Sequence, residues 1–341
     1  MHEQTAAGEG LGVREARPLR EEQGELAIEL QGLEKVWRTG FRLKPVQTLF
    51  DLSLKVYPGE IYGFIGPNGA GKTTTIKILM GLARPTRGRV LIFGRDAQEV
   101  AQKAQVGYLP ERPYFYEYLT AVEFLDFYGQ LFKLPPAVRK RRIDELLERV
   151  SLSPHRNTAL GRFSKGMLQR VGIAQALIND PALVVLDEPM SGLDPLGRML
   201  MRDLILELRA KGKTVFFSTH ILSDVELICD RVGIIVGGRR KEEGTLEELL
   251  HHRLKGIELV ANVAEAARGR LEEALRPHSR QLKWQNERLL IDVADQEAQG
   301  RVLAVLQQLG AGLESVVPRR ESLEELFTDE LHEVKRTGKG G

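Results

Sequence analysis

The chain has 341 residues, 42% hydrophobic and 28% charged, which is enough for a large globular domain and a smaller one. The formal net charge of +2 is nearly balanced and excludes a bulk electrostatic attraction to nucleic acid or to anionic lipid. The single cysteine, Cys229, excludes a disulfide within the chain and favours a reducing compartment.

Neither a membrane span nor a secretion signal is expected. No apolar stretch approaches the roughly 18 residues that cross a bilayer. The polar N-terminus lacks the apolar core of a signal peptide. We therefore expect a cytoplasmic chain that reaches a membrane only through a partner. Residues 1–25 and 334–341 are poor in large apolar side chains and are expected to be disordered tails.

The first ordered elements are expected to be short strands and a helix. Apolar runs predict strands at Ala27–Leu30, Leu49–Val56 and Ile61–Ile65, with a turn at Pro58-Gly59 between the last two. A helical pattern follows over Thr74–Leu82. A strand that leads through a glycine-rich turn into a helix is the start of an α/β fold.

The middle of the chain alternates helices with buried strands. Apolar residues recur at three- and four-residue spacing through residues 120–178, which predicts a helical subdomain at about 112–180. Val184–Leu186 and Thr214–Ser218 have the short apolar runs of buried strands. This order predicts an α/β fold with a mostly parallel sheet covered by helices on both faces, within a domain at 26–250.

A second, smaller domain is expected at 251–333. Thr245 and Glu248 form a capping-box start to a linking helix. The residues after it have the order strand, helix, strand, strand, helix, strand, which is typical of a small α+β ferredoxin-like unit. The expected strands are Ile257–Val263, Gln281–Gln285, Leu289–Val293 and Leu313–Val317, the helices are Ala264–Leu275 and Gln296–Leu309, and a capped helix follows Ser322.

A phosphate-binding loop is the most specific motif. Its residues are Gly66, Pro67, Asn68, Gly69, Ala70, Gly71, Lys72 and Thr73, which match G-x-x-x-x-G-K-[ST] between a strand and a helix. Glycines let backbone N–H groups wrap around phosphate oxygens, and the helix N-terminus adds positive potential. In this chemistry Lys72 reaches the β- and γ-phosphates of a nucleotide and Thr73 ligates Mg²⁺, with Thr74 as a second hydroxyl.

Two carboxylates end a later buried strand. Residues 182–188 read A-L-V-V-L-D-E, so Asp187 and Glu188 follow an apolar run. We expect Asp187 to hold the magnesium ion and Glu188, which points differently, to polarise the attacking water. A surface turn after a strand is the alternative for this motif taken alone.

A third segment gives the chain a family resemblance. Residues 163–170 read F-S-K-G-M-L-Q-R and resemble the signature loop of ABC (ATP-binding cassette) ATPases, whose usual form is L-S-G-G-Q. Ser164 and Gly166 are kept, whereas Lys165 and Met167 depart. The S-K-G-M form resembles exporters of the drug, sodium and polysaccharide type. The resemblance implies that Ser164 and Gly166 complete the ATP site of a second subunit, although Ser164 also suits a helix N-cap.

Further residues match the family residue by residue. Asp194 lies in S-G-L-D-P, which resembles the family's D-loop and also suits a helix start. His220 resembles the switch histidine that touches the γ-phosphate, and Trp37 falls where an aromatic residue stacks on adenine. At Glu111 the chain departs, because the family has a glutamine there. A carboxylate at that position can still ligate Mg²⁺ or hold its water.

The resemblance covers about residues 26–250 and implies an ATPase that works in pairs. ATP with Mg²⁺ is cleaved by water to ADP and phosphate, and two chains clamp two ATP molecules head to tail. The partners implied are a second ATPase subunit and separate transmembrane permease subunits, so the chain would lie on the inner face of the cell membrane and energise an exporter. Residues 251–333 resemble, weakly, an extension found on some exporter subunits.

Two other functions compete with this one. A soluble ABC-type ATPase of translation or DNA repair would carry paired cassettes or a long coiled-coil insertion, and the sequence has neither. A regulatory binder that does not hydrolyse ATP is disfavoured by Glu188 and His220. The basic run Arg139–Arg142 lies beside acidic residues and fits a solvated helix face better than a nucleic-acid site.

Aromatic residues gather in residues 108–132. Four of them recur at three- and four-residue spacing and are expected to pack a helical core: Phe124, Phe127, Tyr128 and Phe132. A second group has no helical period and follows Pro113 in a loop. Surface aromatics are favoured interface anchors. We expect this second group to form a groove for a short helix of the membrane subunit, coupled to the nucleotide through Glu111: Tyr114, Phe115 and Tyr116.

Overall fold

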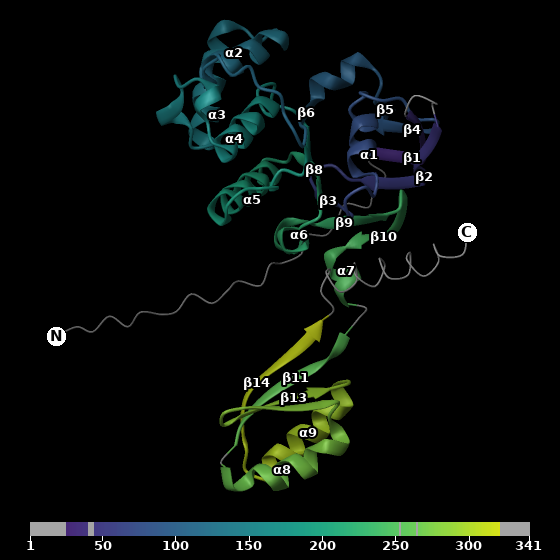
Figure 1. Ribbon diagram of the computed structural model, residues 1–341, viewed down its shortest axis with the longest axis vertical. Coiled ribbons are helices and arrows are strands. Elements are labelled where there is room, and N and C mark those ends of the chain that lie inside the picture. Colours follow the sequence, from purple (N-terminus) through teal and green to yellow (C-terminus); the bar gives the residue numbers. More distant parts are fainter. Residues whose placement is uncertain (1–24, 40–43, 252–253, 264, 321–341) are drawn as a thin grey trace, which may run out of the picture.

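A computed structural model describes residues 25–39, 44–251, 254–263 and 265–320 (Figure 1). Its centre is a six-stranded sheet of order β10-β9-β3-β8-β7-β6, in which β10 is antiparallel to β9 and the other neighbours are parallel. All side chains of β3, β7 and β8 are buried, because helices or a second sheet cover both faces. The strands are β3 (Ile61–Ile65), β6 (Val106–Leu109), β7 (Leu183–Asp187), β8 (Thr214–Thr219), β9 (Arg231–Val236) and β10 (Arg239–Thr245).

Alternate side chains of β3 serve two separate cores. Tyr62 and Phe64 pack with helix α1 (Lys72–Leu79) and with the second sheet. Ile61 and Ile65 pack on the opposite side with the helices that come after β6. Side chains of a strand alternate between its two faces, so a single short strand joins both cores. The parallel sheet with both faces covered confirms the fold class predicted from the sequence.

The second sheet was not predicted. It has four antiparallel strands in the order β2-β1-β4-β5, and in Figure 1 it lies on the side of the molecule away from α4 and α5. β1 extends beyond the predicted strand. Register shifts interrupt its pairing with β2, and such bulges break the two-residue alternation by which a strand is recognised in a sequence, so the rest of β1 was not predicted. The strands are β1 (Ile28–Thr39), β2 (Lys44–Val56), β4 (Arg87–Ile92) and β5 (Arg95–Asp96).

Three helices form the predicted helical region. Thr120 begins the first of them with a capping box to Glu123. In the basic run, Arg139 donates to Asp126, and Arg142 donates to the carbonyls of Ile178 and Leu177 at 3.0 and 2.7 Å. These two arginines are therefore structural. The helices are α2 (Ala121–Leu131), α3 (Pro136–Arg149) and α4 (Lys165–Ala176), and α5 (Pro195–Ala210) and α6 (Leu222–Ile228) come next.

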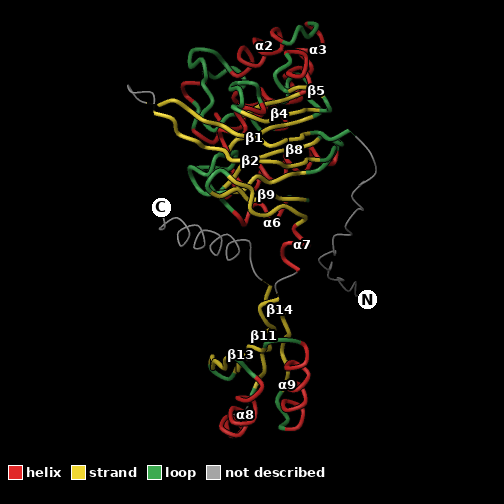
Figure 2. Tube along the Cα trace, turned by 90° about the vertical axis from the view of Figure 1, so that its right-hand side faces the viewer, coloured by secondary structure: helices red, strands yellow, loops and turns green. Residues whose placement is uncertain are grey.

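The last described unit is a small sheet backed by two helices, set off beyond helix α7 (Leu246–His251) in Figures 1 and 2. Thr245 and Glu248 form the predicted capping box, with bonds of 2.8 and 3.1 Å. The sheet order is β12-β13-β11-β14, all antiparallel, which is the order of a ferredoxin-like unit. The elements are β11 (Leu254–Asn262), α8 (Arg268–Leu275), β12 (Gln281–Gln285), β13 (Arg288–Val293), α9 (Gln296–Gln308) and β14 (Gly312–Arg320).

Some predicted segments lie outside the described residues: the N-terminal tail up to residue 24, the C-terminal tail at 334–341 and the helix after Ser322. Within the described part of the chain, no helix combines the length and apolar character that crossing a membrane requires.

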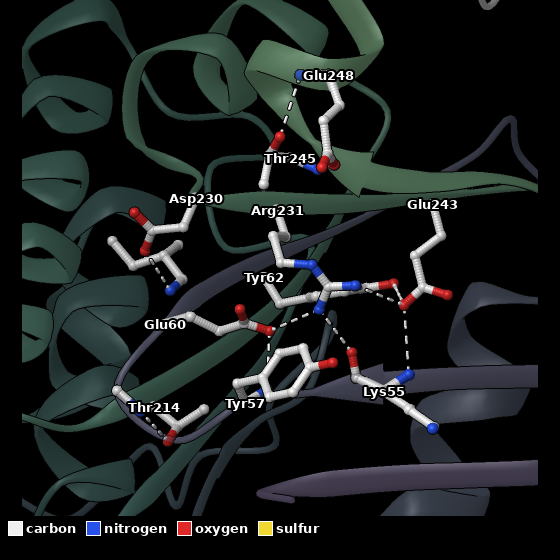
Figure 3. A network of polar contacts seen from close by, with 12 residues as sticks. Lys55, Tyr57, Glu60, Tyr62, Thr214, Asp230, Arg231, Glu243, Thr245 and Glu248 are labelled. Carbon is white, nitrogen blue, oxygen red and sulfur yellow. Dashed lines mark hydrogen bonds and ion pairs between the residues drawn. The ribbon is translucent and has the colours of Figure 1, made fainter. Parts of the chain in front are cut away.

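A buried polar network joins the amino end of β3 to β9 and β10 (Figure 3). The Arg231 guanidinium donates to Glu60 Oε1 and to Glu243 Oε1, each at 3.3 Å. The Tyr62 hydroxyl donates to the same Glu243 oxygen at 3.1 Å, and the Tyr57 N–H donates to Glu60 at 2.9 Å. Burial raises the pKa of Glu60 to about 7, although the Tyr57 N–H and the Arg231 guanidinium each act to lower that pKa.

Candidate functional site

The predicted site residues meet at one edge of the parallel sheet. The glycine-rich loop follows β3, His220 follows β8 and Glu188 follows β7, and these three strands are direct neighbours. Glu111 comes two residues after β6, the next strand along. Carboxyl ends of parallel strands lie at the same edge, which is where ligands bind in open α/β sheets. The sheet order therefore brings together motifs that are far apart in the sequence.

The loop at residues 66–71 presents the start of α1 without a side-chain cap. Gly71 is the N-cap, with φ 110° and no side-chain acceptor for the first N–H groups of the helix. A Cβ at Gly71 would lie 2.7 Å from Leu49, so only glycine fits the close approach of β2. Uncapped N–H groups at a helix N-terminus suit an anion. Within the loop Asn68 and Gly69 are exposed, Pro67 is half-buried and Ala70 is buried, and Thr74 is half-buried in the first turn.

Lys72 lies beneath this loop and forms a buried ion pair. Its Nζ donates to the Gly66 carbonyl at 2.6 Å and lies 3.2 Å from Glu188 Oε1, with only 6% of the residue exposed. The other oxygen of Glu188 lies 2.8 Å from Nδ1 of His220. The three predicted catalytic groups thus contact one another in a row. The sequence placed them at one site but did not predict the pairing of Lys72 with Glu188.

Asp187 and Thr73 are neighbours, as a shared magnesium site requires. Asp187 Oδ1 accepts from Ser218 Oγ at 2.6 Å and from Thr73 Oγ1 at 3.5 Å. Asp187 Oδ2 is buried and has no hydrogen-bond partner among the residues that the structure describes. Burial raises the pKa of Asp187, while the bonds from Ser218 and Thr73 lower it. A buried, unsatisfied carboxylate oxygen beside a hydroxyl fits a hard cation that prefers oxygen ligands.

The protein supplies few ligands for such an ion. Among the described residues, no group of three or more His, Cys, Asp or Glu side chains is placed to hold a metal. Mg²⁺ is commonly held by one or two protein groups together with phosphates and water. The pair Asp187 and Thr73 therefore fits Mg²⁺ that arrives with a phosphate ligand better than a metal cage.

Glu111 is near enough to Asp187 for its charge to act on that carboxylate, but it shares no hydrogen bond with Asp187, Thr73 or Ser218 among the described contacts. Its charge is one of the lesser causes that raise the pKa of Asp187, after burial. Its carboxylate is about half exposed and lies 4.0 Å from Nε of Arg112. Its role as a metal ligand stays a prediction.

Two residues of the site were missed from the sequence. Ser218 donates to the Asp187 carboxylate at 2.6 Å and accepts from the Glu188 backbone N–H at 3.0 Å, so it holds one carboxylate and the backbone of the next residue. Gln169 donates to the Pro189 carbonyl at 2.9 Å and ties α4 to the turn after β7. The sequence of β8 has three hydroxyl residues, Thr214, Ser218 and Thr219, and only the strand register, in which Ser218 lies opposite Asp187, distinguishes Ser218.

The predicted signature loop contacts the predicted D-loop of the same chain. Ser164 is the N-cap of α4 and accepts from Met167 N at 3.3 Å, and Asp194 caps α5 by accepting from Gly197 N at 2.8 Å. A Cβ at Gly166 would lie 3.7 Å from Leu193. Across the described residues, no hydrogen bond or ion pair joins Ser164 or Asp194 to the glycine-rich loop. Both N-cap interpretations are thus confirmed.

Trp37 lies near the end of β1, opposite Val46 of β2. It is half-buried and belongs to none of the buried core clusters. The alternative of plain core packing is therefore wrong for Trp37. The Lys35 ammonium lies 4.2 Å from the centre of its ring.

The aromatic loop borders a cavity of about 320 Å³ between the helical region and the sheet. Tyr114, 82% exposed, and Phe115 line it, but Tyr116 does not. Tyr116 instead packs its ring against Tyr118 and Phe127. The predicted groove residues therefore divide between the cavity and an aromatic cluster beside it.

The predicted helix face on α2 is largely correct. Phe124 is buried, and Tyr128 and Phe132 pack against the same core. Phe127 is 39% exposed, so its assignment to the core was wrong. Its ring lies over Tyr116 of the loop instead.

Comparisons with known proteins agree with this site. Residues 49–191 match the model of the ABC transporter family. The chain is 45% identical over 312 residues to an uncharacterized ABC transporter ATP-binding protein of Synechocystis, covering 90% of this chain and 85% of the relative. It is 43% identical over 212 residues to the bacitracin transport ATP-binding protein of Bacillus licheniformis, covering 61% and 68% of the two chains.

A solved structure is similar in the same region. It is a dimeric ATP-binding cassette in a post-hydrolysis state bound to ADP and Pi, 25% identical, with a TM-score of 0.59, covering 64% of this chain and 98% of the cassette. The similarity to the Synechocystis protein extends over the sheet domain and most of the small C-terminal unit. The chain therefore belongs to the ABC transporter family, as one of its ATP-binding subunits.

Proposed function

We propose that this chain binds ATP with Mg²⁺ at the carboxyl edge of the parallel sheet and hydrolyses it to ADP and phosphate. The observation that carries the proposal is the row of contacts from Lys72 through Glu188 to His220, next to the unsatisfied oxygen of Asp187. Phosphoryl transfer requires a buried lysine, a helix start with free N–H groups, and oxygen ligands for Mg²⁺, which Asp187 and Thr73 supply here.

Each residue then has one task. Lys72 and the N–H groups at the start of α1 hold the β- and γ-phosphates. Thr73 and Asp187 hold Mg²⁺, which supplies positive charge to the phosphates when bound. Glu188 accepts the proton of the attacking water, and His220 orients the Glu188 carboxylate through their 2.8 Å contact. Trp37 stacks on the base, and Glu111 holds a water of the ion.

The complete site needs a second subunit. Ser164, Gly166 and Asp194 carry the family's other nucleotide contacts, and within the described part of one chain Ser164 and Asp194 have no bond to the glycine-rich loop. We place them against the γ-phosphate held by another ATPase subunit, so that two chains clamp two ATP molecules head to tail. The similar cassette that is dimeric supports this arrangement.

The transported cargo passes through separate membrane subunits. The cavity lined by Tyr114 and Phe115 is proposed to receive a helix of that permease, with the chain on the inner face of the cell membrane. The similarity to a bacitracin transport protein and the S-K-G-M signature loop favour export. The soluble alternative is not favoured.

The domain boundaries belong to the same proposal. We assign residues 26–250 to the ATPase domain and residues 251–333 to an accessory domain for dimer contact or regulation. The separate buried core of the small sheet supports this division. A chain truncated near Gly244 is expected to stay soluble and to bind ATP. Failure of that truncated chain to fold would place the boundary elsewhere.

The substitution Lys72→Ala tests the nucleotide site. It should remove a preorganised electrostatic contact worth about 3–4 kcal/mol of transition-state stabilisation, a loss of several hundred-fold in phosphate release. Lys77→Ala is the matched control, because Lys77 is exposed on the same helix. Near-normal turnover in the Lys72 variant would reject the assignment.

The substitution Tyr114→Ala tests the permease groove. It should weaken the complex with the membrane subunit by on the order of 2 kcal/mol, the scale of an interface hot spot. ATPase activity of the isolated subunit should stay unchanged. Tyr118→Ala is the matched control, since Tyr118 is 77% exposed but does not line the cavity. Equal loss of complex in both variants would place the groove elsewhere.

A further inference from the structure

One face of the Trp37 ring is already occupied. The Lys35 ammonium lies 4.2 Å from the ring centre, and its Nζ donates to the Arg84 carbonyl at 2.7 Å. Lys35 and Trp37 are two residues apart on β1, where a register shift lies between Lys35 and Val36, and the contact itself shows that the two side chains meet. The backbone bond holds the ammonium in place, and the ammonium in turn restrains the indole.

The other tryptophan of the chain, Trp284, has the packing and hydrogen bonding of a structural side chain. Trp284 packs against the core of the small C-terminal sheet, and its Nε1 donates to Glu272 at 3.3 Å. Arg268 covers it at 5.1 Å. Trp37 lies outside the buried cores, and within the described residues its indole N–H has no hydrogen-bond partner. The Lys35 ammonium is thus the polar group seen to contact the Trp37 ring among the described residues.

We propose that Lys35 is a positioning residue for the nucleobase of ATP. It holds the indole so that a purine stacks on the ring face opposite the ammonium. The cation also draws electron density from the indole, which favours contact with an electron-rich base on that opposite face. This inference rests on the proposed ATP site. It assigns Lys35 to base binding only, with no effect on the triphosphate.

The test uses the full chain with Trp284→Phe, which leaves Trp37 as the sole fluorescent tryptophan. Mg-ATP and Mg-tripolyphosphate are titrated into this parent chain and into three variants of it, which carry Lys35→Met, Lys35→Arg or Lys103→Met. Tripolyphosphate binding is followed by competition with a fluorescent ADP. Lys103 is the matched control, because its Nζ also donates to a backbone carbonyl, that of Met80, at 3.1 Å.

Lys35→Met should weaken Mg-ATP binding about two- to five-fold, the scale of one cation–π contact, and reduce the quenching of Trp37 by ATP. Tripolyphosphate binding should stay unchanged. Lys35→Arg should restore ATP affinity and quenching, and Lys103→Met should change neither. Unchanged ATP affinity in Lys35→Met would overturn the role of Lys35 alone, as would an equal loss of both ligands. A parent chain that binds neither ligand would overturn the proposed ATP site as well.

Discussion

The two ends of the central strand β3 carry buried ionic groups that differ in how their charges are balanced. At its amino end, the carboxylates of Glu60 and Glu243 contact the Arg231 guanidinium (Figure 3), and Glu243 also pairs with the guanidinium of Arg240. Formal charges there sum to zero. Two aromatic rings, Tyr57 and Tyr62, also lie against Arg231, so this end is closed within the protein.

At the carboxyl end the charges do not balance. Lys72 pairs with Glu188, and the exposed Arg112 lies 4.0 Å from Glu111, so that within the described residues of this cluster three carboxylates face two cations and Asp187 has no cationic partner. In the described part of the chain, one oxygen of Asp187 has no hydrogen-bond partner. Unbalanced buried charge destabilises a fold unless a ligand completes it. Both ends are buried, so it is the unbalanced charge that separates the ligand site at the carboxyl end from the structural network at the amino end.

The largest effect is expected at the carboxyl end, from Glu188→Gln. Loss of the general base should lower phosphate release by roughly 10²–10⁴-fold while ATP still binds. Because the clamp opens only after hydrolysis, ATP should hold the variant as a dimer in size-exclusion chromatography. Glu145→Gln, on the surface of α3, is the control. A variant that hydrolyses normally and stays monomeric with ATP would contradict the role of Glu188.

The substitution Arg231→Met should destabilise the amino end by about 3–5 kcal/mol, because it leaves the buried Glu60 without its cation and removes one of the two guanidinium partners of Glu243. Urea unfolding measures this loss. Arg141→Met removes an exposed pair with Glu145 and should lose less than about 1 kcal/mol. Equal losses in the two variants would show that the network is not a closed structural unit.

The smallest effect concerns pH. Glu60 has a pKa of about 7 in the folded protein, against an ordinary value of 4.5, so the folded state binds more protons between these values. The free energy of unfolding should therefore fall as pH rises from about 4.5 to 7, by up to about 3 kcal/mol, and level off above. Glu60→Gln should remove this fall. The same slope in both proteins would show that Glu60 does not titrate there.

The site residues could be predicted because their motifs are local. Eight consecutive residues define the phosphate loop, and Asp187 and Glu188 stand at the end of one apolar strand. Contacts between neighbouring strands could not be predicted in this way. The bond of Ser218 to Asp187 and the pair of Lys72 with Glu188 depend on the sheet order β3-β8-β7. That order is set by tertiary packing.

The fold was predictable where side-chain periodicity is regular. β12 has the predicted bounds, Gln281–Gln285, and the small C-terminal sheet has the predicted order of elements. The antiparallel sheet was missed because bulges between Leu30 and Val36 interrupt the alternation of β1. Phe127 was wrongly assigned to a core because helical spacing shows which residues share a helix face but not what packs against that face. The ring of Phe127 contacts Tyr116 of the loop.

The central claim is that the unbalanced carboxyl end of β3 is a site for ATP with Mg²⁺. The most direct measurement is phosphate release from ATP by the purified chain, with Mg²⁺ and with the ion removed by chelation, compared with Asp187→Asn. We expect phosphate release with Mg²⁺, little without it, and little from the variant under either condition. Release that is equal with and without Mg²⁺, or unaffected by the loss of the Asp187 charge, would contradict it.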